Sequence, residues 1–231
     1  SINRGDPFAF PMPDGSVSDR SKEIIAGYHR LKLDAIIGIG GDGSLSILRK
    51  LAEQGDMNLI GIPKTIDNDV GRTENSIGYA TAVDVATEAL DRLQPTAASH
   101  DRVMVLEVMG RNAGHIALSA GIAGGADAIL LPEIKWKMDS LVTKLNQVRG
   151  ATRKFALVIV AEAARLPSGK IIGRDRTHGE YRLGGVAHEI GRLIEKVTNA
   201  ETRVTVLGHV QRGGSPNSND RLYASAFALR R

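Results

Sequence analysis

Short apolar runs alternate with amphipathic stretches along the 231-residue chain. The runs have the length and bulk of buried strands, and the stretches between them repeat apolar residues at the spacing of a helix. The pattern predicts strands at 34–40, 58–63, 102–108, 128–131, 155–161 and 203–207. It predicts helices from 18 or 19 to 32, at 44–54, 76–93, 113–123, 138–149 and 184–197, and from 220 onward.

This order of elements predicts an α/β fold in which mostly parallel sheets are sandwiched by helices. Residues 34–40 are expected to form a strand buried on both faces, and the helix at 76–93 is expected to end before Pro95. Residues 166–182 are polar and contain glycines, which predicts an exposed loop. Because ligands bind beyond the carboxyl ends of parallel strands, the polar residues that follow five strands predict one binding cleft.

Composition and charge narrow the classes of function. The net charge is +4, with hydrophobic residues at 42% and charged residues at 24%, which fits a soluble globular protein. The basic residues are scattered, so an anionic small substrate is favoured over nucleic acid or a membrane surface. The chain has no cysteine, which is compatible with a reducing compartment but does not require one. It shows neither an apolar run long enough for a membrane helix nor a leader, and a cytoplasmic location is expected.

The glycine turn Gly40–Gly43 joins a predicted strand to a predicted helix. Glycines let the backbone approach phosphate oxygens, and a helix N-terminus favours negative charge. Asp42 within this turn can hold magnesium directly or through water. The alternative is a tight turn with a capping aspartate. Lipid kinases and NAD kinases carry a similar turn, so the turn alone does not identify the substrate.

The segment PKTIDND, at 63–69, follows the next predicted strand. If it is extended, alternate side chains share one face, which places Thr65, Asp67 and Asp69 together. Asp67 is then the candidate general base for an alcohol. Asp69 is a candidate magnesium ligand, because two carboxylates suffice for an ion that keeps much of its water. The alternative is a polar loop whose aspartates bond to their own backbone.

Further candidates for anion binding lie at or beside the ends of other strands. Guanidinium groups bind phosphate through two parallel hydrogen bonds, and four arginines in such positions favour an anion site over ordinary surface residues. They are Arg102, Arg111, Arg203 and Arg212. His209 can donate to a phosphate or sugar oxygen, and Glu162 can accept from sugar hydroxyls or cap a following turn. Together these features predict a kinase of a small phosphorylated sugar.

Five segments together resemble the 6-phosphofructokinase family, and the similarity covers essentially the whole chain. They are GIGGDGS (38–44), PKTIDND (63–69), SHDRVMVLEVMGRNAGHIA (99–117), IAGGAD (122–127) and ETRVTVLGHVQRGGSP (201–216). The resemblance implies a glycolytic kinase that uses ATP and Mg²⁺ to phosphorylate the 1-hydroxyl of fructose 6-phosphate. It also implies a phosphofructokinase-like fold and a homotetramer whose active sites lie at subunit borders.

On the donor side, the resemblance assigns a role to each matching position. Asp67 matches the catalytic base, and Thr65 matches a contact to the transition state and the substrate. The nucleotide-phosphate turn corresponds to Gly41, Asp42, Gly43 and Ser44. Asp42 and Asp69 match the magnesium-associated aspartates of the family.

On the sugar side, Arg111 matches an arginine near the transferring phosphoryl group, with Met109 and Gly110 at the sugar. Other residues of the fructose 6-phosphate site correspond to Glu162, His209 and Arg212. Arg102 and Arg203 match residues that reach the sugar phosphate from a neighbouring subunit.

Two positions bear on the phosphoryl donor. Family members that use diphosphate typically carry aspartate at the position of Gly43, where a carboxylate would crowd and repel the α-phosphate of a nucleotide. Gly43 therefore favours ATP. Lys64 favours diphosphate, because diphosphate users carry lysine there, although some ATP users combine this glycine with this lysine. ATP is the expected donor, and diphosphate-dependent and ADP-dependent enzymes are the open alternatives.

The chain also departs from the family pattern. The strand and loop with which family members begin are absent before Ser1, and so are the helix and strand that follow Arg231 in the family. We therefore expect residues 1–231 to be an incomplete, internal phosphofructokinase-like region with two interleaved α/β subdomains and a boundary near 95–110. The departure favours one alternative, a non-catalytic fragment that binds sugar phosphate. An NAD or lipid kinase rests on the glycine turn alone.

Overall fold

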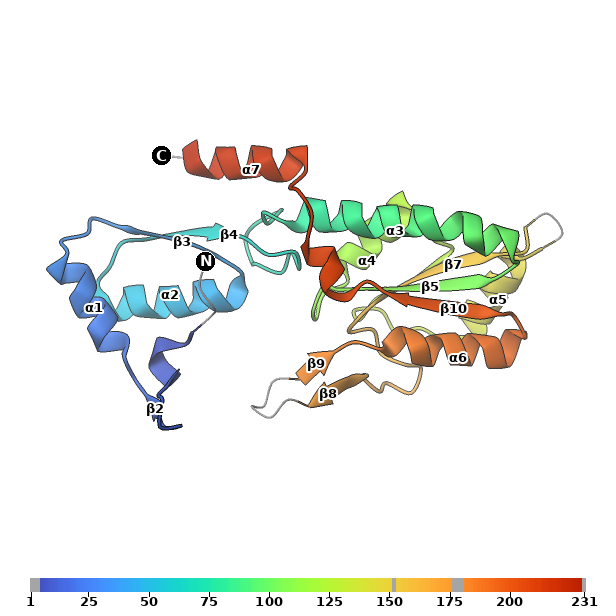
Figure 1. Ribbon diagram of the computed structural model, residues 1–231, viewed down its shortest axis with the longest axis horizontal. Coiled ribbons are helices and arrows are strands. Elements are labelled where there is room, and N and C mark those ends of the chain that lie inside the picture. Colours follow the sequence, from blue (N-terminus) through green and yellow to red (C-terminus); the bar gives the residue numbers. More distant parts are fainter. Residues whose placement is uncertain (1–4, 151–152, 176–180, 230–231) are drawn as a thin grey trace. The chain divides into compact units, whose positions relative to one another are not determined.

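The computed structural model describes residues 5–150, 153–175 and 181–229 (Figure 1). Proximity of Cα atoms divides the chain into two compact units. The first unit lies within residues 1–65, 69–74 and 227–231, and the second within 66–68 and 75–226. Residues 95–110, where the sequence predicted a boundary between subdomains, all lie in the second unit.

The second unit is built on a parallel sheet with strand order β10-β5-β7-β6. Its strands are β5 (Val103–Val108), β6 (Ala128–Leu130), β7 (Ala156–Ala161) and β10 (Thr202–Val206). The helices that pack on it are α3 (Tyr79–Ser99), α4 (His115–Ala123), α5 (Met138–Val148) and α6 (Val186–Thr198). Side chains of α3 and α4 cover one face, and those of α5 and α6 cover the other. The predicted α/β sandwich is confirmed in this unit.

Both faces of the central strands are buried because alternate side chains enter two different cores. Val103 and Val105 of β5 pack with α5 and α6, whereas Leu106 and Val108 pack with α3 and α4. Every residue of β5 and of β7 is buried. Removal of this apolar surface from water stabilises the unit by about 25 cal/mol per Å². Burial of both faces also explains why the sequences of β5 and β7 are almost continuous apolar runs.

The first unit contains a parallel pair of strands, β3 (Ile36–Gly40) and β4 (Leu59–Pro63), with the helices α1 (Ser21–Arg30) and α2 (Asp42–Gly55). Glycines lie on the face of β3 that meets α2. A Cβ atom at Gly38 would lie 2.4 Å from Leu48 Cδ1, and one at Gly40 would lie 2.8 Å from Ser44 Cβ. The absence of side chains at these glycines therefore lets α2 approach the strands closely.

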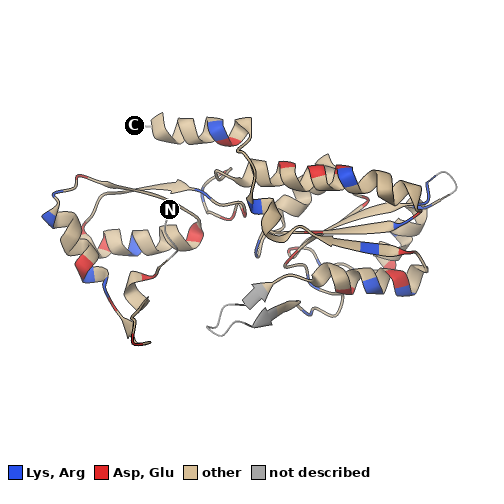
Figure 2. Ribbon diagram, viewed as in Figure 1, with Lys and Arg blue, Asp and Glu red and all other residues tan. Residues whose placement is uncertain are grey.

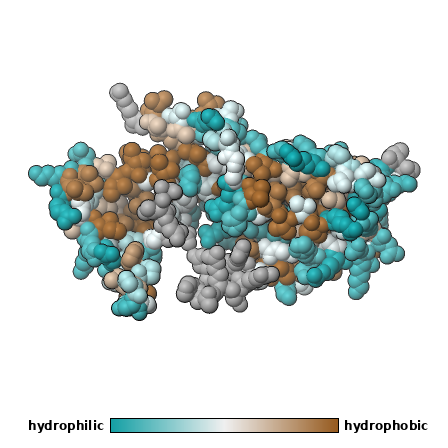
Figure 3. Space-filling view, in the orientation of Figure 1, coloured by the Kyte–Doolittle hydropathy of each residue, from teal (hydrophilic) through white to brown (hydrophobic). Residues whose placement is uncertain are grey.

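The other face of β3 and β4 is exposed. Ile37, Ile39 and Ile60 are 62%, 62% and 55% exposed, and Figure 3 shows apolar side chains gathered over this unit. The expectation that residues 34–40 form a strand buried on both faces is therefore wrong for the part of the chain that the structure describes. An apolar run shows that a strand can be buried, but the packing of other segments decides whether both faces are covered.

The helix α3 also differs from the expectation. It does not end before Pro95 but continues to Ser99. Beyond the proline, Ala97 is fully buried and packs with Met104 and Leu157. This packing offsets the loss of the hydrogen bond that a proline nitrogen cannot donate. The helix therefore continues past a proline, a residue that usually ends a helix.

The predicted loop at 166–182 contains the short antiparallel strands β8 (Gly173–Asp175) and β9 (Tyr181–Leu183). Residues 176–180 of this loop lie outside the described residues. Such short strands carry no apolar alternation that would reveal them in the sequence. The remaining elements are η1 (Pro7–Ala9), β1 (Phe10–Pro11), β2 (Val17–Ser18), η2 (Gly208–Arg212) and α7 (Ser218–Leu229). In the described part of the chain, no helix has both the length and the apolar character needed to cross a membrane.

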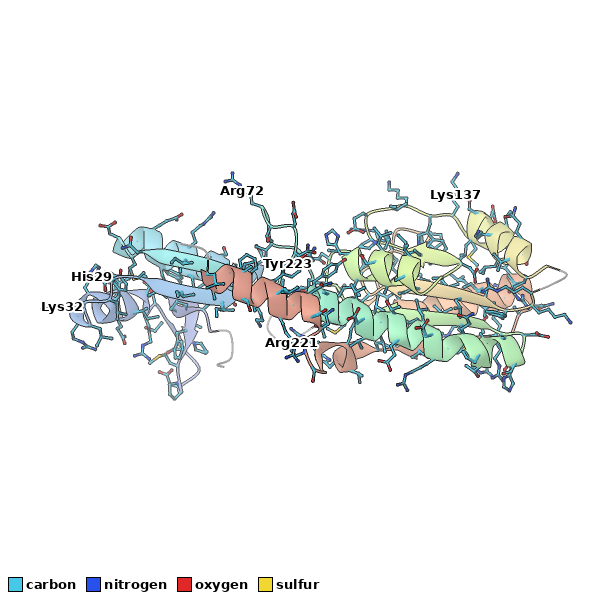
Figure 4. The ribbon with its side chains drawn as sticks, turned by 90° about the horizontal axis from the view of Figure 1, so that it is seen from above. His29, Lys32, Arg72, Lys137, Arg221 and Tyr223 are labelled. Atoms are coloured by element: carbon cyan, nitrogen blue, oxygen red, sulfur yellow. The ribbon has the colours of Figure 1, made fainter. Side chains whose placement is uncertain are left out.

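Acidic side chains from distant segments cap three helices of the second unit. They are Glu107 at the start of α6, Glu133 at the start of α4 and Asp220 at the start of α3. A carboxylate is favoured there because it accepts from unpaired N–H groups and faces the positive end of the helix dipole. Asp220 lies on α7, as does Tyr223 (Figure 4). The Tyr223 hydroxyl accepts a hydrogen bond from the Asn75 side chain. These contacts fix the ends of the helices that surround the sheet.

Candidate functional site

Three groups of predicted site residues lie at one edge of the sheet in the second unit. Val108 ends β5 and is followed by Met109–Arg111, and Glu162 directly follows the end of β7. The 3-10 turn Gly208–Arg212 follows β10. Because β5 pairs in parallel with both β7 and β10, the carboxyl ends of the three strands are neighbours. The fold therefore brings together three segments that are far apart in the sequence.

The loop Met109–Arg111 has a backbone that few residues adopt. Gly110 has φ 152°, and a Cβ atom there would lie 2.5 Å from the carbonyl oxygen of Ala113. Arg111 has φ 55°, in the left-handed region that residues other than glycine rarely occupy, and its side chain is exposed. Strain of this kind is commonly found at functional sites, where surrounding contacts hold it in place.

Glu162 holds this loop from the neighbouring strand. Its Oε1 atom accepts hydrogen bonds from the backbone N–H groups of Arg111, at 2.8 Å, and of Gly110, at 3.2 Å. Burial raises the pKa of Glu162, and these two N–H groups oppose the rise. The negative charges of Asp67 and Glu107 raise this pKa further. Glu162 is thus a loop-binding carboxylate whose protonation depends on its buried surroundings.

The turn Gly208–Arg212 places its polar side chains in two different environments. His209 and Arg212 are exposed, as a role in ligand binding requires. Gln211 is only 1% exposed, and its Oε1 atom accepts a hydrogen bond from the Met109 N–H at 2.8 Å. Sequence reasoning gave Gln211 no role. Its place within the GHVQRGG motif was the available signal, but the sequence does not show which member of a polar motif is buried.

The PKTIDND segment is not an extended strand throughout. The chain bends at Asp67, and Asn68 has φ 54°. The side chain of Asn68 accepts a hydrogen bond from the Ser76 N–H at 2.8 Å, which stabilises a turn in this conformation. The expectation that strand alternation places Thr65, Asp67 and Asp69 on one face required an extended segment, and this condition is not met.

The PKTIDND segment instead contributes to both units. Thr65 and Asp69 belong to the first unit, and 66–68 belong to the second. Ile66 packs against the core formed with α3 and α4. Asp67 lies near enough to Glu162 to raise the pKa of its carboxyl group, so Asp67 is part of the electrostatic surroundings of the loop-binding carboxylate.

The glycine turn lies at the carboxyl ends of β3 and β4 in the first unit. Gly41 is extended and precedes α2, and the Lys64 N–H donates to the carbonyl oxygen of Gly40 at 2.8 Å. A Cβ atom at Gly41 would lie 3.4 Å from Thr65 Cβ, so the turn and Thr65 are adjacent. The first turn of α2 comprises Asp42, Gly43 and Ser44. A glycine backbone that leads into a helix N-terminus is the arrangement that binds phosphate in other proteins.

The predicted magnesium ligands Asp42 and Asp69 are both exposed and both belong to the first unit. Across the described residues, no three His, Asp or Glu side chains gather closely enough to hold a metal ion by themselves. Two exposed carboxylates are compatible with magnesium that keeps several waters, because that ion needs only one or two protein carboxylates.

Arg102 and Arg203 lie at the opposite edge of the second unit's sheet. Arg102 directly precedes β5, and Arg203 is near the start of the adjacent β10. Glu201 accepts hydrogen bonds from both guanidinium groups, with a distance of 2.9 Å to Arg102. These contacts, led by the one from Arg102, lower the pKa of Glu201. The six residues of β5 separate Arg102 from Met109, which at about 3.3 Å per residue is about 20 Å.

Within one chain, Arg102 and Arg203 therefore do not join Arg111, Glu162 and Arg212. That separation agrees with the expectation that they serve the site of a neighbouring subunit, which stays a prediction. Figure 2 shows Lys and Arg interspersed with Asp and Glu over the described residues, as the scattered charges of the sequence predicted.

Comparison with solved structures supports the fold. The structure of phosphofructokinase from Saccharomyces cerevisiae matches with a TM-score of 0.73 and 30% identity, over 90% of this chain and 29% of that one. A pyrophosphate-dependent phosphofructokinase from Nitrosospira multiformis matches with a TM-score of 0.76 over 91% of this chain and 53% of that one. At 22% identity, this match shows only that the two chains share a fold.

Comparison with curated proteins supports the family. This chain is 61% identical to "ATP-dependent 6-phosphofructokinase 1" of a Nostoc species and 60% identical to the Synechocystis protein of the same name, over 99% of its length. It spans 64% and 63% of those proteins, respectively, which is less than two thirds. The family description "Phosphofructokinase" matches residues 2–231. On this match, and on the fold that it shares with solved members, the chain belongs to the phosphofructokinase family.

Proposed function

We propose that the protein transfers the γ-phosphoryl group of ATP to the 1-hydroxyl of fructose 6-phosphate, giving fructose 1,6-bisphosphate and ADP. The observation that carries this proposal is the meeting of Met109–Arg111, Glu162 and Gly208–Arg212 at the carboxyl ends of three neighbouring strands. The names of the relatives at 61% and 60% identity support ATP as the donor. A glycolytic kinase of this kind works in the cytoplasm, which we include in the proposal.

Asp67 is the proposed general base and accepts the proton of the attacking hydroxyl. A base contributes by orienting the nucleophile and removing its proton as the new bond forms. Burial is the main cause of the raised pKa of Glu162, and the negative charge of Asp67 adds to it, which supports placing Asp67 near the carboxyl ends of these strands. Thr65 is a proposed contact to the substrate and the transition state. Arg111, whose exposed guanidinium group follows the strained loop, stabilises negative charge on the transferring phosphoryl group.

Each substrate is assigned to residues of one unit. The nucleotide phosphates bind at the glycine turn, and Asp42 and Asp69 hold magnesium that accompanies them, with Lys64 adjacent to the turn. Bound magnesium neutralises phosphate charge during transfer. The sugar phosphate is held on the second unit by the exposed side chains of His209 and Arg212, with Met109 and Gly110 at the sugar and Glu162 holding their loop.

We also propose that the protein acts as a homotetramer with shared active sites. Arg102 lies six residues, about 20 Å, before the end of β5, and Arg203 lies three residues, about 10 Å, before the end of β10. Both guanidinium groups bind Glu201 near the amino ends of β5 and β10, away from the residues proposed to hold the sugar phosphate of the same chain. A neighbouring copy that presents this edge would complete the phosphate site, because symmetric assembly repeats each contact in every subunit.

A side-by-side assay of phosphoryl donors tests the proposed activity. The purified protein is incubated with fructose 6-phosphate, Mg²⁺ and either ATP, diphosphate or ADP, and formation of fructose 1,6-bisphosphate is measured. We expect robust turnover with ATP. Turnover with diphosphate and none with ATP would replace the donor assignment, and turnover with ADP alone would replace it in the same way.

A non-catalytic role, in which the chain binds sugar phosphate without transferring a phosphoryl group, is the second candidate. Isothermal titration with fructose 6-phosphate, run beside the turnover assay on the same preparation, separates the two candidates. Binding with turnover supports the kinase. Binding without turnover for any of the three donors supports a sugar-phosphate-binding role for this chain.

A further inference from the structure

We propose that Gln211 is a positioning residue that sets the conformation of the Met109–Arg111 loop and couples it to the turn that carries His209 and Arg212. This inference rests on the proposed function, because it concerns how the fructose 6-phosphate site is held in shape. Gln211 would not touch the substrate. It would act through the backbone of Met109 and through its own place in the Gly208–Arg212 turn.

The contacts of Gln211 identify this role. Its side chain is 1% exposed, so both of its polar ends must find partners within the protein. The Oε1 atom accepts from the Met109 N–H at 2.8 Å, and the Nε2 atom donates to the carbonyl oxygen of Ala82 on α3 at 3.4 Å. One buried amide thus joins the loop after β5, the turn after β10 and the helix α3.

Gln211 completes a set of contacts that Glu162 begins. Glu162 accepts from the N–H groups of Gly110 and Arg111, and Gln211 accepts from that of Met109. Three consecutive backbone N–H groups of the loop are therefore held by two side chains from two other strand ends. Left-handed φ values at Gly110 and Arg111 persist only where surrounding contacts fix them. Loss of the Gln211 contact would release the first residue of this strained loop.

The two neighbours of Gln211 explain why the effect would be specific for the sugar phosphate. His209 and Arg212 lie on the same short turn and have exposed side chains, so a shift of the turn moves both. The proposed nucleotide turn belongs to the other unit of the chain. A positioning role therefore predicts a change in the KM for fructose 6-phosphate without an equal change in the KM for ATP. A role limited to stability would change neither.

The test uses Gln211→Met, which keeps the size of the side chain but removes both hydrogen bonds. We expect the KM for fructose 6-phosphate to rise on the order of tenfold, as the loss of one buried hydrogen bond can produce, with the KM for ATP within about twofold of the wild-type value. Gln147→Met is the matched control, because Gln147 is exposed on α5. A folded Gln211→Met enzyme with an unchanged KM for fructose 6-phosphate would overturn the proposal.

Gln211→Glu keeps an acceptor for the Met109 N–H but loses the amide that donates to the Ala82 carbonyl oxygen, so it tests the loop contact by itself. We expect its KM for fructose 6-phosphate to stay close to the wild-type value. If Gln211→Met does not fold, this variant decides: a tenfold rise in KM while the Met109 amide stays protected from hydrogen exchange would contradict the proposal, and near-normal kinetics would support it.

Amide exchange at Met109 separates failure of this proposal from failure of the proposed function. We expect slow exchange in the wild type and in Gln211→Glu, and faster exchange in Gln211→Met. This readout does not require turnover, so it remains informative if the wild type has no activity with fructose 6-phosphate and ATP. Equal exchange in all three proteins would overturn the positioning role whatever the activity.

Discussion

The two units of this chain use similar apolar strands in different ways. In the second unit, β5 and β7 are buried along their whole length, because helices cover both faces of the sheet. In the first unit, α2 packs on the glycine face of β3, while Ile37, Ile39 and Ile60 on the other face are more than half exposed. All of these strands are apolar, so the difference in burial depends on which helices pack on which face.

The two units also differ in how they hold chemically important backbone groups. In the second unit, the half-buried Glu162 and the buried Gln211 accept hydrogen bonds from the N–H groups of the Met109–Arg111 loop. In the first unit, the glycine turn precedes α2 with an N-cap residue, Gly41, that has no side chain to cap the helix. A pre-shaped loop suits recognition of a sugar phosphate, and a bare helix N-terminus suits a nucleotide that brings its own phosphates.

The largest expected effect is that of a substitution in the PKTIDND segment, which contributes residues to both units. Asp67→Ser removes the proposed base and should lower kcat by about 100- to 10,000-fold, with a modest change in the KM for fructose 6-phosphate. Steady-state kinetics with ATP as donor measure both constants. Asp91→Ser, an exposed aspartate of α3, is the control. Near-normal turnover of Asp67→Ser would show that Asp67 is not the base.

The second prediction concerns the first unit alone. Gly43→Asp places a carboxylate at the glycine turn, where it would repel a nucleotide phosphate, and a charge a few ångströms away can weaken binding by about a hundredfold. We expect kcat/KM for ATP to fall by about that factor while binding of fructose 6-phosphate, measured by titration, is retained. Gly27→Asp on α1, where a Cβ meets no atom within 4 Å, is the control. Loss of fructose 6-phosphate binding in Gly43→Asp would contradict the proposal that the first unit binds the nucleotide and the second unit binds the sugar phosphate.

The third prediction tests whether the distant arginines serve another copy of the chain. Arg203→Ala and Asp67→Ser should each be nearly inactive alone at low fructose 6-phosphate. When the two variants are mixed, dissociated and reassembled, random pairing gives about a quarter of the shared sites both an intact Asp67 and an intact Arg203. We expect activity to recover accordingly. No recovery, in mixtures shown by mass spectrometry to contain both variants, would contradict shared sites.

The smallest expected effect concerns stability and pH. Burial raises the pKa of Glu162, so the folded state binds its proton more tightly than the unfolded state does. Stability therefore falls as pH rises from the ordinary glutamate pKa, about 4.3, through the raised value. Glu162→Gln keeps an oxygen acceptor and removes the charge, so its Tm should exceed that of the wild type at pH 8.

The difference in Tm between Glu162→Gln and the wild type should shrink as the pH falls toward about 4.3, the ordinary pKa of a glutamate in an unfolded chain. Thermal unfolding followed at several pH values measures the difference. Glu53→Gln, an exposed residue of α2, is the control and should show no such trend. A difference in Tm that is independent of pH would contradict a raised pKa as its cause.

Strand–helix periodicity was enough to predict the order of the larger elements and the α/β sandwich of the second unit. It placed Met109–Arg111, Glu162 and the GHVQRGG motif after strands, and β5, β7 and β10 bring them to one edge. These predictions succeeded because apolar spacing and glycine turns are local properties of a chain. For PKTIDND the prediction of an extended segment failed, because the hydrogen bond from the Ser76 N–H to Asn68 comes from outside the motif.

By itself, the sequence determined which segments form strands and helices and which polar residues follow them, since both depend on residues close together in the chain. Only the tertiary structure decided that Ile37 and Ile39 remain exposed. It also decided that α3 continues past Pro95 and buries Ala97, and that Gln211 is buried against Met109. Each of these depends on a partner that is distant in sequence. Burial and hydrogen bonding between such partners are set when the chain packs, and no local pattern encodes them.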